Sequence, residues 1–185
     1  EKIKGFDENS LLVKEANRQC TNKVAFITKD IFQELDKASS NIVCAFFVLE
    51  HINNGNDIWK KLSSMPKGTI FVFSVPTFSF STVLECGIDD IAARNLDNVL
   101  HTQIYTDQSI DYCLEEYGFK KCAEWLFGQD SQELCSMILK KIKPNINSKL
   151  FNKVSSQFER LIDPIQEIID KSRFCDARHI IAIKS

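Results

Sequence analysis

The feature that most constrains the fold is a continuous apolar run that ends abruptly in polar residues, IVCAFFVLEHINN at positions 42–54. Such a run has no polar face, so it indicates a strand buried on both sides, as in a parallel sheet covered by helices. In sheets of this kind, ligands bind outside the carboxyl ends of the strands. We therefore expect Glu50 and His51 to face a ligand site or to anchor the turn after the strand.

Short apolar runs and helical segments alternate along the first half of the chain. The β-branched and aromatic runs predict strands, and the spacing of apolar residues predicts helices between them. Asn9 or Ser10 is suited to cap the first helix. This alternation is typical of an α/β fold built on a parallel sheet. The predicted strands are VAFIT (24–28), NIVCAFFVL (41–49) and TIFVFSV (69–75), and the predicted helices are 10–20 and 58–65.

The second half of the chain is richer in helix. Thr106 with Ser109 forms a helix-start signature, and Pro164 should kink or reset the last long helix. The predicted elements are a helix that begins after Thr106 and stops at Gly118, a strand at 119–127, helices at 130–142 and 155–174, and a closing strand at 179–184.

The length of 185 residues supports one hydrophobic core and is too short for two full domains. We therefore predict a single domain over 1–185. The polar and aromatic connection at 77–104 is long for a compact domain, and connections of this length often form lids or substrate loops. The segment 129–175 is predicted to be a helical insert before the last strand.

The composition argues against several classes of protein. The net charge of −2 disfavours a general nucleic-acid or membrane-surface binder, and no segment has the length of a membrane span. The seven cysteines show no Cys-x-x-Cys pair, so we interpret them as reduced core residues of a cytoplasmic protein. Their spacing predicts no metal site.

Four segments in order carry a resemblance to a known family: IKGFDEN, FITKDIF, NIVCAFFVLEHINN and GTIFVFSVP. Their order and spacing resemble the class I S-adenosylmethionine-dependent methyltransferases. The resemblance implies a Rossmann-like, mostly parallel sheet with helices on both faces and a terminal antiparallel strand. The later segments around HTQIYTDQSI and EWLFGQD resemble enzymes that act on sugars or related metabolites. The implied cofactor is S-adenosylmethionine, and the implied partner is a small-molecule acceptor rather than nucleic acid or membrane.

The resemblance also implies a cofactor site. Asp7 matches the acid that holds the ribose hydroxyls, and a carboxylate can accept hydrogen bonds from both vicinal hydroxyls. Asp30 and Ile31 match the acid and apolar residue that hold the adenine. Ala45 and Phe46 begin the segment that passes beneath the methionine part of the cofactor.

Each of these residues also has a plainer interpretation. Asp7 could form a turn before the first helix, and Asp30 could cap the turn after its strand. Phe46 could pack in the core, and His51 could be a hydrogen-bonded residue that anchors a turn.

The connection at 77–104 is implied to cover the acceptor, and two residues at its end are candidates for catalysis. His101 has the ordinary pKa of a group that can accept a proton near neutral pH, so we consider it as a general base. Tyr105 is the next candidate. The alternative for His101 is an exposed loop residue without a catalytic role.

One part of the family pattern is absent. None of the six glycines forms the glycine-rich turn that follows the family's first strand, so we expect that strand and turn to precede Glu1. Two rival functions remain open: a Rossmann-like NAD-dependent oxidoreductase, which also needs an acid for its ribose, and a non-catalytic nucleotide-binding subunit. The sequence carries no signal for an oligomeric state.

Overall fold

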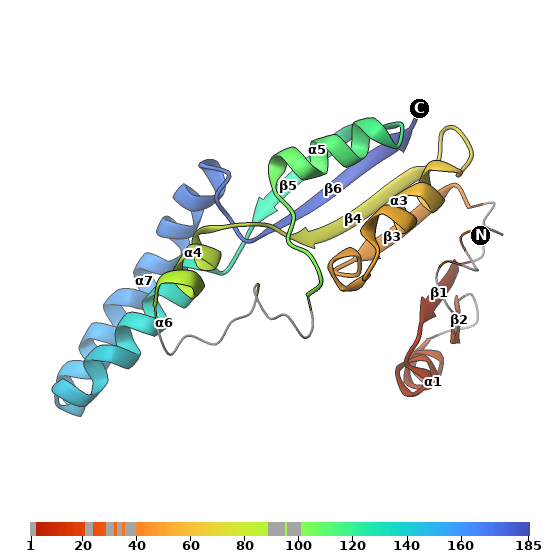
Figure 1. The fold of residues 1–185 in the computed structure, drawn as a ribbon. Helices are drawn as coiled ribbons and strands as arrows, with labels where there is room; N and C mark the ends of the chain where they lie inside the picture. Colours follow the sequence, from red (N-terminus) through yellow and green to blue (C-terminus); the bar gives the residue numbers. More distant parts are fainter. Residues whose placement is uncertain are drawn as a thin grey trace.

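The computed structural model describes residues 3–20, 24–28, 32, 35, 40–88, 95 and 101–185. Within these residues the protein is an α/β fold with two separate sheets and helices packed against them (Figure 1). Asp30 and Ile31, and much of the connection at 77–104, lie outside the described residues.

The larger sheet has four strands and a mixed direction. Its order is β3-β4-β6-β5, and β3 runs parallel to β4, whereas β6 runs antiparallel to both of its neighbours. A mostly parallel sheet with a terminal antiparallel strand is therefore confirmed. The strands are β3 (Ile42–Phe46), β4 (Ile70–Pro76), β5 (Phe119–Phe127) and β6 (Ala177–Lys184).

The smaller sheet is a β-α-β unit at the start of the chain. Strands β1 (Ile3–Asp7) and β2 (Val24–Thr28) are parallel, and α1 (Ser10–Gln19) connects them. The Asn9 side chain caps α1, as the sequence predicts, by accepting hydrogen bonds from the first backbone N–H groups of the helix. Among the described residues, β1 pairs only with β2, and β3 pairs only with β4.

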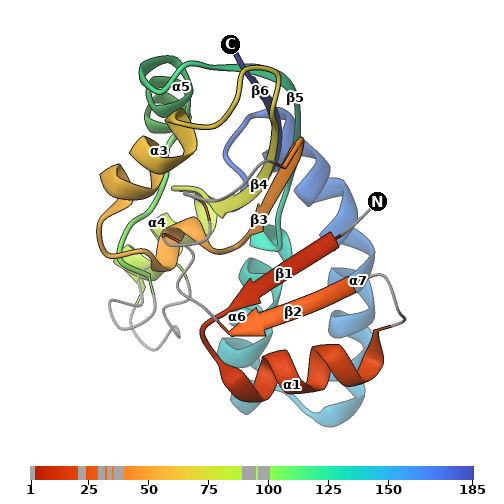
Figure 2. The ribbon, with the colours of Figure 1, turned by 90° about the vertical axis from the view of Figure 1, so that its right-hand side faces the viewer.

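One face of the larger sheet is covered by α3 (Gly55–Ser63) and α5 (Asp107–Glu116), as Figure 2 shows. The indole of Trp59 fills the centre of this layer, with its ring centroid 5.9 Å from that of Phe71 and 5.7 Å from that of Phe73. It also stacks on Tyr117. Edge-to-face aromatic packing of this kind is a strong stabilising feature of a core. It fixes α3, and with it the loop that precedes α3.

The C-terminal helices occupy the predicted segment 129–175. They are α6 (Asp130–Ile142), a 3-10 turn at Lys143–Asn145, and α7 (Ser148–Lys171). The prediction of a reset at Pro164 is wrong, because α7 is one continuous helix of 24 residues that includes Pro164. Proline removes one backbone donor, and here the packing of α7 along α6 outweighs that loss.

A buried carboxylate joins the C-terminal helices to the rest of the fold. The Asp130 side chain accepts hydrogen bonds from the backbone and hydroxyl of Ser81 at 2.9 and 2.7 Å. It also accepts from the Asp176 backbone at 3.0 Å and from Gln166 at 3.2 Å. Ser81 lies in α4 (Phe80–Gly87), so a single side chain links α4, α6, α7 and the start of β6.

The other face of the larger sheet remains partly open. Strand alternation places one residue of each strand in a row across this face, where Phe46 pairs with Ser74, Ser74 with His179, and His179 with Trp125. Phe46 is 55% exposed and Trp125 is 64% exposed. Ile42 and Ile181 on the same face are also exposed. Exposed apolar areas of this kind commonly mark surfaces of association.

The cysteines only partly follow the prediction. None of the seven forms a disulfide, but only Cys135 and Cys175 are buried, whereas four are exposed. The prediction that they are core residues is therefore wrong for most of them. In the part of the chain that is described, no helix has the length and apolar character needed to cross a membrane.

Charged side chains connect the start of α5 to the end of α7. Arg173 adopts a left-handed conformation with φ of 62° just after α7. Its guanidinium donates to Asp107 at 2.8 Å and also to Glu124. Arg178, which is buried, pairs with Asp107 as well. The hydrogen bond from Arg173, with help from Lys121, lowers the pKa of Glu124 to about 2.

We expect the free energy of unfolding to fall as the pH drops from about 4.5, the ordinary pKa of a glutamate, toward 2. The depressed pKa of folded Glu124 means that its stabilising contribution is present above the ordinary value and is lost as the carboxylate becomes protonated. Urea denaturation at several pH values measures this change. Arg173→Ala should reduce the slope in this window, whereas Arg160→Ala, on an exposed part of α7, should not. Equal slopes for both variants would contradict this assignment.

We also expect the chain to self-associate through the open face of the sheet. Trp125→Lys should lower the apparent mass at high concentration in sedimentation velocity, because a charge on this face is costly to bury. Tyr112→Lys is a matched control, since Tyr112 is equally exposed at 64% but lies on α5, which covers the opposite face. A wild-type protein that stays monomeric at high concentration would rule out this expectation.

Candidate functional site

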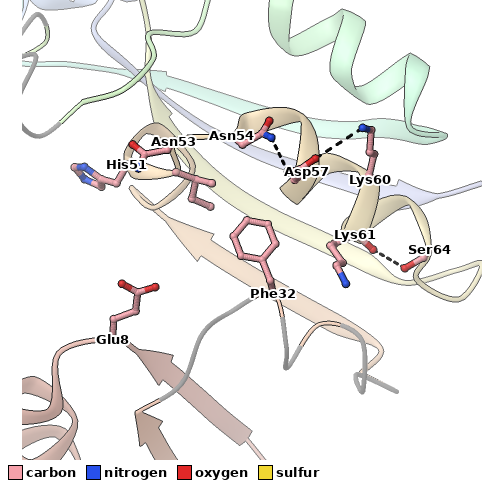
Figure 3. A pocket seen from close by; sticks show the side chains of 10 residues that line it. Glu8, Phe32, His51, Asn53, Asn54, Asp57, Lys60, Lys61 and Ser64 are labelled. Carbon is pink, nitrogen blue, oxygen red and sulfur yellow. Dashed lines mark hydrogen bonds and ion pairs between the residues drawn. The ribbon is translucent and has the colours of Figure 1, made fainter.

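A pocket of about 790 Å³ lies between the carboxyl end of β1, the loop that joins β3 to α3, and one side of α3 (Figure 3). Its position agrees with the rule that ligands of such sheets bind beyond the carboxyl ends of strands. Eight of its ten lining residues have polar or charged side chains, and Figure 3 shows Glu8, just after β1, on one side and His51 on the opposite side. The lining residues are Glu8, Phe32, His51, Ile52, Asn53, Asn54, Asp57, Lys60, Lys61 and Ser64.

The abrupt end of β3 has a specific backbone cause. Phe47 adopts a left-handed conformation with φ of 53°, and its N–H donates to the carbonyl of Ser74 at 3.0 Å. A bulky residue in this region is strained, and such strain is concentrated at functional sites. The chain then enters a 3-10 turn at Leu49–His51. The strand is therefore shorter than the predicted 41–49, and its last apolar residues belong to the turn.

The two ionisable residues of this turn differ in burial. Glu50 is only 1% exposed, whereas His51 is exposed and lines the pocket. The Glu50 Oε1 atom lies 3.8 Å from Nε2 of His51. Among the described residues, the buried Oε2 atom of Glu50 has no hydrogen-bond partner. Burial raises the pKa of this carboxyl group, while the nearby His51 and His101 act in the opposite direction.

Two residues from the distant loop hold this turn in place. The N–H of Thr102 donates to the carbonyl of Glu50 at 2.8 Å, and its hydroxyl donates to the same carbonyl at 2.9 Å. The amide of Gln103 donates to the carbonyl of Leu49 at 2.7 Å. A Cβ atom at Gly55 would come within 2.5 Å of the Gln103 amide, so a larger residue there would displace this amide from its present position. These contacts fix the loop against the end of β3.

His101 is consequently held beside His51. The centroids of their rings are 5.0 Å apart. Nδ1 of His101 lies 3.3 Å from the carbonyl oxygen of Asn95. The sequence places His101 near an acceptor, and the structure brings it next to Glu50 and His51. The sequence does not reveal the contacts of Thr102, Gln103 and Gly55, because their partners lie far away along the chain.

The structure places Asp7 at the carboxyl end of β1, where the resemblance implies it. Asp7 is exposed, and its Oδ1 atom accepts from the N–H of Asn9 at 2.7 Å. This contact corresponds to the turn-forming alternative. A carboxylate has four lone pairs, so the contact leaves further acceptor capacity for a ligand. The neighbouring Glu8, which the sequence analysis did not select, lines the pocket directly.

Ala45 and Phe46 lie on opposite faces of β3. Ala45 is buried in the core beneath α3, whereas Phe46 lies on the open face, with its ring centroid 6.2 Å from that of His179. Because successive residues of a strand alternate, only one of the two side chains can face a ligand from a given side. Neither is among the described residues that line the pocket.

Tyr105 is buried rather than directed toward an acceptor. Its hydroxyl accepts from Gln103 at 3.1 Å, and its carbonyl accepts from the N–H of Phe78 at 2.7 Å. Burial raises the pKa of this phenol far above its ordinary value. A group with these properties is a poor proton acceptor at neutral pH. The geometry therefore favours a structural role for Tyr105, in which it holds the loop in place, rather than a role in proton transfer.

Neither known protein-family profiles nor curated proteins match this chain. Solved structures do match. A methyltransferase from Archaeoglobus fulgidus that depends on S-adenosylmethionine aligns with a TM-score of 0.56 at 16% identity, over 98% of this chain and 75% of its own. The magnesium protoporphyrin IX methyltransferase of Synechocystis, with bound S-adenosylhomocysteine, aligns at 0.57 and 14% identity, over 100% of this chain and 64% of its own. The chain has the fold of the class I S-adenosylmethionine-dependent methyltransferases.

The likeness extends to enzymes with different acceptors. The phosphoethanolamine N-methyltransferase 2 of Haemonchus contortus aligns with a TM-score of 0.57 at 10% identity, over 99% of this chain and 44% of its own. Because one methyltransferase fold serves several acceptors, the acceptor must be inferred from the site itself. In this methyltransferase fold, the pocket lies at the carboxyl edge of the strands, beside the loop that carries His101.

We expect Gln103→Ala to destabilise the protein by about 1–3 kcal/mol, because it leaves the Leu49 carbonyl and the Tyr105 hydroxyl without their donor. Hydrogen exchange of the backbone at 101–105 should also accelerate. Gln108→Ala is a matched control, since Gln108 is exposed on α5. Chemical denaturation measures the stability of both variants. An effect of Gln103→Ala no larger than that of the control would show that Gln103 does not hold the loop.

Proposed function

We propose that the protein transfers a methyl group from S-adenosylmethionine to a small-molecule acceptor. The observation that carries this proposal is the combination of a methyltransferase fold with a polar pocket at the carboxyl ends of β1 and β3. The second solved structure described above holds S-adenosylhomocysteine, which is the product of such a transfer.

On the cofactor side, we assign the ribose contact to Asp7 at the end of β1. Its position supports this role, because a carboxylate at a strand end can accept from two vicinal hydroxyls. Glu8 extends the acidic edge into the pocket. Asp30 and Ile31 remain proposed adenine contacts, and Ala45 and Phe46 remain proposed neighbours of the methionine part.

On the acceptor side, we place the loop that contains His101. A bound S-adenosylmethionine supplies a methyl group on a sulfonium centre, and displacement at that carbon requires alignment with a nucleophile. The residues of this chain need only orient the acceptor and assist its deprotonation. The hydrogen bonds from Thr102 and Gln103 to the turn after β3 give this loop the rigidity that alignment demands.

The pocket supports a polar acceptor, such as a sugar or related metabolite. Asn54 donates to Asp57 at 2.6 Å, and Lys60 lies 3.7 Å from Asp57, so amide, carboxylate and ammonium groups alternate along its wall (Figure 3). Such a wall recognises hydroxyl and charged groups.

The net charge of −2 disfavours nucleic acid, and the seven unpaired cysteines favour a reducing, cytoplasmic location.

Isothermal titration calorimetry with S-adenosylhomocysteine and, separately, with NAD tests this proposal. We expect saturable binding of S-adenosylhomocysteine and none of NAD. Binding of NAD alone would favour an oxidoreductase. Binding of S-adenosylhomocysteine without transfer of a labelled methyl group to any of a panel of polar acceptors would favour a non-catalytic nucleotide-binding subunit.

Asp7→Ala should weaken the binding of S-adenosylhomocysteine by about 1–3 kcal/mol, which corresponds to roughly 5- to 150-fold in the dissociation constant. Asp7→Asn separates two causes of such a loss, because its amide oxygen can still accept from Asn9 while the charge is removed. We expect Asp7→Asn to fold normally and to bind weakly. Asp163→Ala, on an exposed part of α7, is the control. An unchanged dissociation constant in both Asp7 variants would remove Asp7 from the cofactor site.

A further inference from the structure

Three side chains that can each donate a metal ligand converge beside the pocket. The ligating atoms of Glu50, His51 and His101 all lie within 4.8 Å of one another. They form the only such group of three among the residues that the structure describes. We propose that Glu50, His51 and His101 bind a divalent transition-metal ion. This inference departs from the sequence analysis, which predicts no metal site.

The distances require only a small closure around an ion. Nitrogen and oxygen ligands of Zn²⁺ lie about 2.1 Å from the metal, so neighbouring ligands in a tetrahedral site are roughly 3.4 Å apart. The three side chains would therefore move together by no more than about 1.5 Å. His51 is exposed and can make this adjustment by rotation of its side chain, while Glu50 stays fixed by its surroundings.

The state of Glu50 is the first independent support. Its Oε2 atom is buried and has no hydrogen-bond partner among the described residues. A buried carboxylate oxygen without a partner is costly, and buried charges are normally paired or bound to a metal. A cation between Glu50 and the two imidazoles would satisfy this oxygen.

The hydrogen bond of His101 is the second support. Nδ1 of His101 lies 3.3 Å from the carbonyl of Asn95. A carbonyl can only accept, so Nδ1 carries the proton and Nε2 presents its lone pair. Metal-binding histidines usually have this arrangement, in which the second nitrogen donates to a carbonyl or carboxylate. The two hydrogen bonds from Thr102 to the carbonyl of Glu50 hold His101 close to the other two ligands.

The ligand types indicate the kind of ion. Two imidazoles and one carboxylate suit Zn²⁺, Co²⁺, Fe²⁺ or Mn²⁺, whereas Mg²⁺ and Ca²⁺ prefer oxygen ligands alone. Three protein ligands would leave a coordination position open, and because His51 lines the pocket, a molecule bound in the pocket could reach the ion there. If the protein is a methyltransferase as proposed, an acceptor oxygen bound there would become more acidic. His101 would then act as a metal ligand in place of a general base.

A Co²⁺ titration of the full chain, followed by visible absorption and by calorimetry, tests the site without any assay of activity. We expect one equivalent to bind with the d–d bands of nitrogen and oxygen ligation. Glu50→Gln and His101→Ala should each weaken binding at least tenfold. His179→Ala is the control, because His179 lies on the open face of the sheet and outside the cluster. Thermal melts of the metal-free variants confirm that they are folded.

Two results would overturn the proposal. One is the absence of stoichiometric binding, or binding that both variants leave unchanged. The other is strong thiolate-to-cobalt charge transfer, which would assign the ion to cysteines. Affinity for S-adenosylhomocysteine is measured separately in the same samples. A wild-type protein that binds S-adenosylhomocysteine but does not bind Co²⁺ would refute the metal site and leave the proposed function standing.

Discussion

The structure around the site depends on the hydrogen bonds that the backbone carbonyls of the turn after β3 accept. A buried strand that stops inside a protein leaves carbonyl groups that need donors. Here the carbonyls of Leu49, Glu50 and Ile52 all accept from Thr102 or Gln103, which lie far along the chain. One set of hydrogen bonds therefore fixes the turn after β3, joins it to the distant loop and brings His101 beside His51.

At the other end of the domain, a few charged side chains likewise connect several helices and strands. Arg173 joins the start of α5 to β5, and Asp130 joins α4 to the two C-terminal helices. Because α5 follows the loop with Tyr105 directly, the arginine network also restrains the acceptor side of the site. The open face of the larger sheet exposes Phe46 and Trp125, which is why we expect association there and not at the pocket.

Most of the fold could be predicted from local pattern. Helix α3 ends shortly before Pro66 and Gly68, β4 ends at Pro76, and α1 and α5 begin directly after their caps, Asn9 and Thr106. The errors arise where distant packing prevails over a local signal. Pro164 should interrupt a helix, but packing on α6 keeps α7 continuous. The proximity of Glu50 and His101 depends on hydrogen bonds across the fold, and no spacing in the sequence encodes it. The position of Asp7 at the carboxyl end of a strand, by contrast, could be predicted from the local sequence alone.

The central claim is that the carboxyl edge of β1 and β3 binds the methyl donor. Hydrogen–deuterium exchange with and without S-adenosylhomocysteine tests it most directly, because exchange reports protection segment by segment. The account predicts slower exchange at residues 5–9 and 46–53, with α7 unchanged. Binding of S-adenosylhomocysteine that protects neither segment, or that protects only the C-terminal helices, would contradict it.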